Sequence, residues 1–170
     1  MNYQDIIAFH GHSCPGLAMG YRMALAGLAA LAAMRSEDEE IVAIVENNAC
    51  GVDALQSLSG CTFGKGNLIF RDYGKQVYTL YNRNRRKGIR VAFNYRNLPE
   101  NIRADRDRFT DWILSAPDDR IVEIREVEMK EPEPARIFKS VPCDLCGENV
   151  METRTREVNG QTVCIPCSAT

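Results

Sequence analysis

The chain has 170 residues, of which 45% are hydrophobic and 26% charged, and its formal net charge is −2. This balance is typical of a globular protein with one ordinary core and room for a small second module. It argues against a strongly basic nucleic-acid-binding protein. The longest apolar run, residues 23–34, is too short to cross a bilayer, and the start of the chain lacks the features of a signal peptide. We therefore expect a cytoplasmic protein that binds neither membranes nor nucleic acid.

The first predicted element is a short helix over residues 3–9, and it leads into a stretch with three metal-capable side chains, His10, His12 and Cys14. In an extended backbone these alternate residues would point to one side and could converge on one ion. Pro15 suits the first position of a helix, which would place Cys14 at the N-cap. The positive end of a helix favours the thiolate over the thiol. These are the only two histidines in the chain.

The next elements combine buried helices with a strand. Residues 15–34 are apolar on nearly every side, which predicts a helix buried in the middle of a domain. The β-branched run at 41–45 predicts a buried strand. Residues 49–58 predict a short helix, and Gly60 is placed to end it.

The second half of the core is predicted to form a sheet with one more helix. We expect strands over 68–73, 76–82 and 89–95. Pro99 would open a helix that runs to about residue 115, and residues 121–129 alternate like an exposed or edge strand. Helices and antiparallel strands are mixed without a repeating βαβ pattern, so the sequence predicts an α+β domain over residues 1–130.

A stiff linker with the sequence Glu-Pro-Glu-Pro starts at residue 131. We expect it to extend over residues 131–142 and to separate the core from a module at 143–170. That module carries two Cys-x2-Cys pairs, formed by Cys143, Cys146, Cys164 and Cys167. Two such pairs can hold one tetrahedral zinc ion.

The residues between the two cysteine pairs predict a hairpin with a type I′ turn at Asn159-Gly160, which would bring the pairs together. With four thiolates the zinc site is closed and therefore structural. Residues 143–170 contain two arginines and four acidic residues. A protein partner therefore suits this module better than a phosphate backbone.

Four further residues of the core are candidates for chemistry. Cys50 stands where the strand at 41–45 gives way to a helix, and Asp53 shares a helix face with it. Cys61 follows the glycine that ends this helix. Lys65 lies between two glycines, in a turn that could hold an anion, although such a turn is more often a plain loop.

Three motifs of the core resemble the FmdE family, which is named after a component of formylmethanofuran dehydrogenase: FHGHSCPG at 9–16, CGVDA at 50–54 and GCTFGKGN at 60–67. The two terminal cysteine pairs are similar to the treble-clef zinc finger that some members carry. The resemblance implies an α+β core, a homodimer and an association with molybdenum or tungsten pterin enzymes of methanogenesis and related anaerobic one-carbon metabolism. The pterin and iron–sulfur chemistry of those enzymes lies in other subunits.

Three functional hypotheses follow for the core. The first is a second transition-metal site, with zinc as the first choice, on His12 and Cys14 with Cys50 or Cys61, and His10 as a further candidate. In that case Asp53 would orient a histidine. The second is an enzyme with a reactive Cys14, Cys50 or Cys61, His12 as base and Lys65 beside the developing negative charge. The third is a module that binds another subunit or a pterin-type ligand without catalysis.

A local basic run lies at residues 83–90, and it contains four arginines and one lysine. It is interpreted first as a solvated hairpin turn, and as a patch for an acidic partner or an anionic cofactor second.

Overall fold

The computed structural model describes residues 1–169, and the chain divides into two compact units between Pro134 and Ala135. The first unit contains a five-stranded sheet in the order β2-β1-β3-β4-β5. Its β1–β2 pair is parallel, and the other three pairs are antiparallel. The strands are β1 (Ile41–Val45), β2 (Leu68–Phe70), β3 (Val77–Asn82), β4 (Lys87–Phe93) and β5 (Val122–Val127). Strand β5 lies at an edge, as its alternating pattern predicted.

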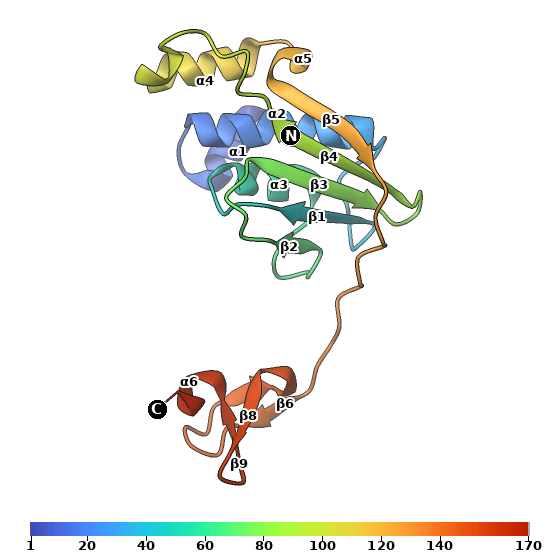
Figure 1. Ribbon diagram of the computed structural model, residues 1–170, viewed down its shortest axis with the longest axis vertical. Helices are drawn as coiled ribbons and strands as arrows, with labels where there is room; N and C mark the ends of the chain where they lie inside the picture. The colour runs from blue at the N-terminus through green and yellow to red at the C-terminus, as the bar shows by residue number, and fades with distance from the viewer. Residues whose placement is uncertain (170) are drawn as a thin grey trace. The chain divides into compact units, whose positions relative to one another are not determined.

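Helices pack on one face of this sheet (Figure 1). They are α1 (Tyr3–His10), α2 (Pro15–Ala30), α3 (Gly51–Ser59), the 3-10 turn η1 (Ile102–Ala104), α4 (Arg106–Ser115) and α5 (Asp118–Ile121). Helix α2 is the central one, because it contacts α1, α3, α4 and strands β3 to β5. The α+β fold predicted from the sequence is confirmed. Within residues 1–169, none of the helices is long and apolar enough to cross a membrane.

Helices α2 and α3 approach each other unusually closely, and glycines make this contact possible. A Cβ atom on Gly20 of α2 would lie 2.2 Å from the Cα atom of Gly51, the first residue of α3. A Cβ on Gly51 would in turn lie 2.8 Å from the carbonyl oxygen of Gly16. No side chain fits between the two backbones, so the starts of α2 and α3 are held against each other.

Helix α2 ends at Ala30 rather than at residue 34. Ala32 takes the left-handed conformation, with φ 46°. The N–H groups of Ala32 and Ala33 donate to the carbonyls of Ala29 and Leu28, which is the hydrogen-bond pattern of a Schellman motif. The sequence did not indicate this end, because alanine stands where glycine is usual.

The helix expected from Pro99 starts later as well. Helix α4 begins at Arg106, and the side chain of Asp105 accepts hydrogen bonds from the N–H groups of Asp107 and Arg108. An aspartate at the N-cap is a stronger start signal than a proline several residues upstream. Residues 99–105 instead contain only the short turn η1.

The second unit contains two small hairpins and a short helix. Its elements are β6 (Ser140–Pro142), β7 (Asn149–Met151), η2 (Glu152–Arg154), β8 (Thr155–Val158), β9 (Gln161–Cys164) and α6 (Ile165–Ser168). Asn159 and Gly160 join β8 to β9 with φ values of 51° and 78°. Both are positive, as a type I′ turn requires, so the predicted hairpin is present.

The boundary between the units lies a few residues beyond residue 130 because Arg83 binds the start of the linker. Its guanidinium donates to the carbonyls of Pro132 (2.6 Å) and Glu133 (3.1 Å) and pairs with the carboxylate of Glu131 (3.0 Å). Residues 131–134 therefore belong to the first unit. Arg83 is thus engaged inside its own unit and does not contribute to a free basic patch.

The glycine contact leads to a stability prediction. We expect Gly20→Ala to lower the free energy of unfolding by about 1–3 kcal/mol, because the new Cβ would overlap the backbone of Gly51. The gain of about 1 kcal/mol in helix propensity does not offset an overlap with backbone atoms. Gly64→Ala is the matched control, because a Cβ there meets nothing within 4 Å. Urea unfolding measures both, and equal midpoints for the two variants would contradict the prediction.

Candidate metal centres

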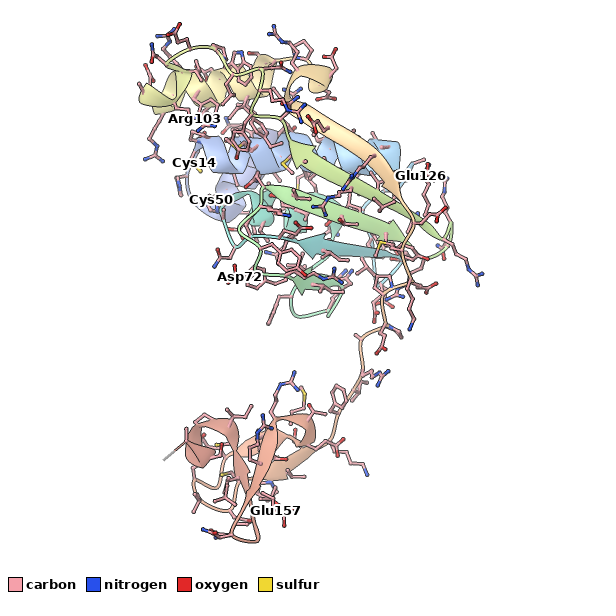
Figure 2. All side chains as sticks on the ribbon, in the orientation of Figure 1. Cys14, Cys50, Asp72, Arg103, Glu126 and Glu157 are labelled. Carbon is pink, nitrogen blue, oxygen red and sulfur yellow. The ribbon has the colours of Figure 1, made fainter. Side chains whose placement is uncertain are left out.

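Four of the predicted residues meet in the first unit. One ligand atom from each of His10, His12, Cys14 and Cys50 lies within 4.8 Å of those of the other three. Cys14 is the N-cap of α2 and Cys50 directly precedes α3, and Figure 2 shows the two cysteines at the starts of these neighbouring helices. The close contact of α2 with α3 thus brings the cysteines together.

The path of the chain through this cluster differs from the extended backbone that was expected. His10 is the last residue of α1, and Gly11 follows in the left-handed conformation with φ 99°. His12 then lies in a bend, and only Cys14 is extended. The side chains converge because a helix end turns back on itself, so the expected alternation along a strand was wrong as the cause.

His10 is held in an orientation that suits a metal ligand. Its Nδ1 atom lies 2.6 Å from Oδ2 of Asp53, whose other oxygen accepts a weaker hydrogen bond from Gln56 (3.4 Å). The Nε2 atom of His10 is buried and has no hydrogen-bond partner among residues 1–169. A carboxylate on one ring nitrogen leaves the lone pair of the other free, as in most histidine ligands of metals.

The two thiols of the cluster have different surroundings. The sulfur of Cys14 is buried and accepts the backbone N–H of Leu17 at 3.3 Å. Burial, followed by the neighbouring sulfur of Cys14, raises the pKa of Cys50. A cation between the two sulfurs would reverse this effect, because a metal ion stabilises its thiolate ligands. Two imidazoles and two thiols together fit a borderline-to-soft metal such as zinc.

The structure does not bring Cys61 or Lys65 into this cluster. Cys61 is fully buried, its thiol donates to the carbonyl of Ile41 (3.2 Å), and burial raises its pKa to about 11. The Nζ atom of Lys65 donates to the carbonyls of Glu37 and Asp38. The motif at 60–67 therefore supports the fold around the start of β1, and Cys50 rather than Cys61 stands beside Cys14.

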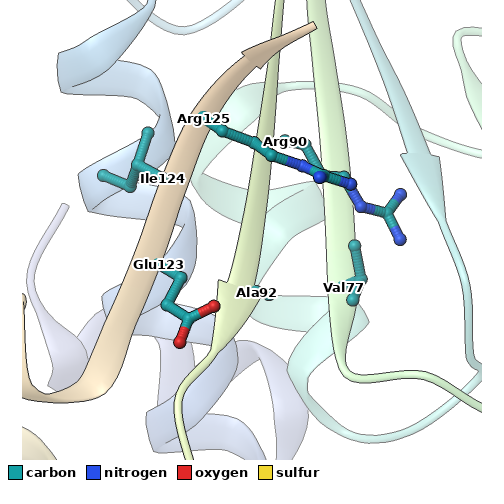
Figure 3. Close-up of a pocket in the computed structure, with 6 residues that line it drawn as sticks. All are labelled: Val77, Arg90, Ala92, Glu123, Ile124 and Arg125. Carbon is teal, nitrogen blue, oxygen red and sulfur yellow. The ribbon is translucent and has the colours of Figure 1, made fainter.

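The remaining part of the basic run lies on the other face of the sheet. Arg90 of β4 makes a two-pronged ion pair with the buried carboxylate of Glu46, which lowers the pKa of Glu46. Arg90 lines a shallow hollow of about 350 Å³ together with Arg125 and Glu123 (Figure 3). Among the described residues, no histidine or cysteine lines this hollow, so it is separate from the metal-capable cluster.

One contributor to the core cluster has no signal in the sequence. Tyr78 of β3 is completely buried, and its hydroxyl lies 2.5 Å from the position that a Cβ on Gly51 would take. The side-chain amide of Gln76 donates to this hydroxyl at 3.4 Å. Tyr78 thus packs beneath the start of α3, close to Cys50. Only the register of β3 against α3 shows this role.

The second unit holds the four terminal cysteines, whose sulfurs also lie within 4.8 Å of one another. Backbone N–H groups of Cys146 and Cys164 point at the sulfur of Cys143 and lower its pKa to about 6. The nearby thiol of Cys164, together with the other two cysteines, raises the pKa of Cys167 to about 12. Four sulfurs gathered this closely repel as thiolates, and a zinc ion relieves this repulsion.

The family model described as "FmdE, Molybdenum formylmethanofuran dehydrogenase operon" matches residues 9–141, more than half of the chain. The chain belongs to the FmdE family. Residues 136–169 match a second model, the prokaryotic dksA/traR C4-type zinc finger. The FmdE resemblance and the zinc-binding finger predicted from the motifs are both confirmed.

Two relatives extend this comparison. The crystal structure of an FmdE-like protein of tungsten formylmethanofuran dehydrogenase from Syntrophus aciditrophicus superposes with a TM-score of 0.76 at 28% identity, covering 99% of this chain and 92% of the other. A probable S-adenosyl-L-methionine-binding protein from Archaeoglobus fulgidus is 33% identical over 189 aligned positions, which cover 94% of this chain. The FmdE-family chain described here spans 50% of the length of that relative.

The contact between His10 and Asp53 predicts how the core binds metal. We expect Asp53→Asn to weaken zinc binding at the core cluster by about 10–100-fold, because an amide no longer fixes the ring of His10 with its Nε2 lone pair free. Competition with a chromophoric chelator measures the affinity. Asp111→Asn, an exposed carboxylate change on α4, is the matched control. The same core affinity in both variants would show that Asp53 does not orient a ligand.

Proposed function

We propose that this FmdE-family chain is a metal-binding accessory protein with two sites. The finger holds one zinc ion, and the core holds a second transition-metal ion, zinc in the first place, on His10, His12, Cys14 and Cys50. The observation that carries the second site is the buried Nε2 atom of His10, which has no partner within the described chain. A buried ring nitrogen left without a hydrogen bond costs free energy, and a metal ion satisfies it.

The metal site is preferred to the thiol enzyme because of where Lys65 lies. A nucleophilic cysteine with His12 as base needs a group that stabilises negative charge on the substrate. Lys65 was the candidate for this role, but its Nζ atom is bound to the loop at 37–38. The cluster retains four donor atoms in one place, and such a set supports metal binding without any further group.

A bound zinc ion would supply Lewis acidity and a lowered pKa for bound water, if one coordination position were open. The chain's own contribution is the set of donors. His10 is oriented by Asp53, the sulfur of Cys14 is positioned by the N–H of Leu17, and Cys50 is packed at the start of α3. These contacts would preorganise the site before the ion binds.

Metal content tests the two-site proposal. For anaerobically purified protein, we expect two zinc ions per wild-type chain, and one in each of Cys14→Ser and Cys143→Ser. Cys61→Ser is the control that the structure provides, because its sulfur bonds to a carbonyl outside the cluster, and it should keep both ions. Elemental analysis measures all four proteins. One ion per wild-type chain that Cys14→Ser leaves in place would refute the core site.

We further propose that the protein is a cytoplasmic homodimer that acts with subunits of a molybdenum or tungsten pterin enzyme, in formylmethanofuran or formate-type one-carbon metabolism. Support comes from the family description and from the tungsten-enzyme name of the Syntrophus aciditrophicus relative. The acidic surface of the finger suits a protein partner, since residues 143–170 carry two arginines and four carboxylates.

Affinity purification tests this association. We expect the tagged chain, expressed in its source organism under anaerobic conditions, to recover a pterin-enzyme subunit that mass spectrometry identifies. The Cys143→Ser variant should lose the partner if the finger docks it, because a finger without its zinc ion does not stay folded. Recovery of the chain alone in repeated preparations would count against an accessory role in such an enzyme.

A further inference from the structure

The two histidines of the core cluster are held very differently. The side chain of His10 is 11% exposed and its Nδ1 atom is bound to Asp53. His12 is exposed, and no hydrogen bond to its ring is found in residues 1–169. Its ring packs against the ring of His10, at a centroid distance of 4.6 Å. Metal-binding histidines almost always donate their second nitrogen to a protein group, and within the described chain His12 lacks this support.

The backbone around His12 also leaves it room to move. Gly11 precedes it in the left-handed conformation, and a Cβ placed on Gly11 would meet no atom within 4 Å. His12 lies in the bend between α1 and α2 rather than in a helix or strand. In contrast, the sulfur of Cys14 is fixed by the N–H of Leu17, and Cys50 is packed at the start of α3. Three donors are therefore anchored and one is loose.

The surroundings of the cluster favour an anion as a replacement for the loose donor. Helices α2 and α3 both start at the cluster, so their positive ends point toward it. His12 is a neutral ligand when it binds, and an anionic ligand in its place would gain from both helix ends. Two cysteine sulfurs in the donor set select a soft metal, which prefers sulfur to oxygen in a further ligand.

We infer that His12 is the exchangeable ligand of the core site, and that a small thiolate takes its place. This inference rests on the proposed core metal site. In the exchange, the bond between the metal and the nitrogen of His12 breaks, and a bond from the metal to the sulfur of the thiol forms. The thiol proton passes to the freed imidazole of His12, so atoms and charge balance without any oxidant or reductant. The chain thus keeps three anchored donors and opens one position toward solvent.

Cadmium NMR of the full chain tests this inference. The protein is loaded with ¹¹³Cd²⁺, so the finger and the core each give one resonance, at positions set by four sulfurs and by two sulfurs with two nitrogens. Addition of 2-mercaptoethanol should shift the core resonance downfield, toward three-sulfur coordination, and leave the finger resonance in place. Ethylene glycol, which has a hydroxyl in place of the thiol, is the matched probe and should shift neither.

Two variants separate a loose ligand from an anchored one. His12→Ala should retain the core resonance and respond to the thiol at about tenfold lower concentration, because no imidazole competes for the position. His10→Ala should lose the core resonance, while the finger resonance shows that the cadmium-loaded chain is intact.

Each outcome of these experiments is decisive. If the core resonance of the wild type ignores the thiol, or if His12→Ala loses this resonance, the inference is wrong while the metal site stands. If the wild type shows no core resonance at all, the proposed function itself is wrong.

Discussion

The close contact between α2 and α3 is the constraint on which the candidate site depends. At Gly20 and Gly51 the two backbones approach so closely that a single added Cβ would overlap main-chain atoms. This contact holds the starts of the two helices side by side, with Cys14 before one and Cys50 before the other. The absence of side chains at two positions therefore decides where the metal-capable sulfurs meet.

Polar contacts then complete what the glycine contact begins. Asp53, in the first turn of α3, binds the ring of His10 at the end of α1 and so links a third helix to the cluster. His12 receives no comparable support from the described residues and is exposed. A site with anchored and loose donors can hold an ion and still exchange one ligand, which is a useful property for an accessory protein of the FmdE family. The finger differs, because its ligands lie in two local cysteine pairs within one small unit.

Local signals predicted most elements of this fold. The buried strand at 41–45, the N-cap role of Cys14, and Gly60 at the end of α3 all agree with the structure. These features depend on neighbouring residues alone. Where prediction failed, longer-range or unusual local bonding decided the outcome. Helix α2 stops early because Ala32 adopts a left-handed conformation without the glycine that usually marks it, and α4 starts at the cap provided by Asp105 rather than after Pro99.

The sequence by itself determined the α+β class, the zinc finger and the inventory of donors in the core, because spacing and residue type encode local geometry. It left open whether Cys50 or Cys61 joins Cys14. Only the tertiary structure decided this choice, since both cysteines flank the same helix and are equally near to it in sequence. Cys50 lies at the start of α3, where the helix meets α2, and Cys61 lies beyond its other end, bound to β1. A helix separates its two ends in space, and packing against α2 selects which end reaches the site.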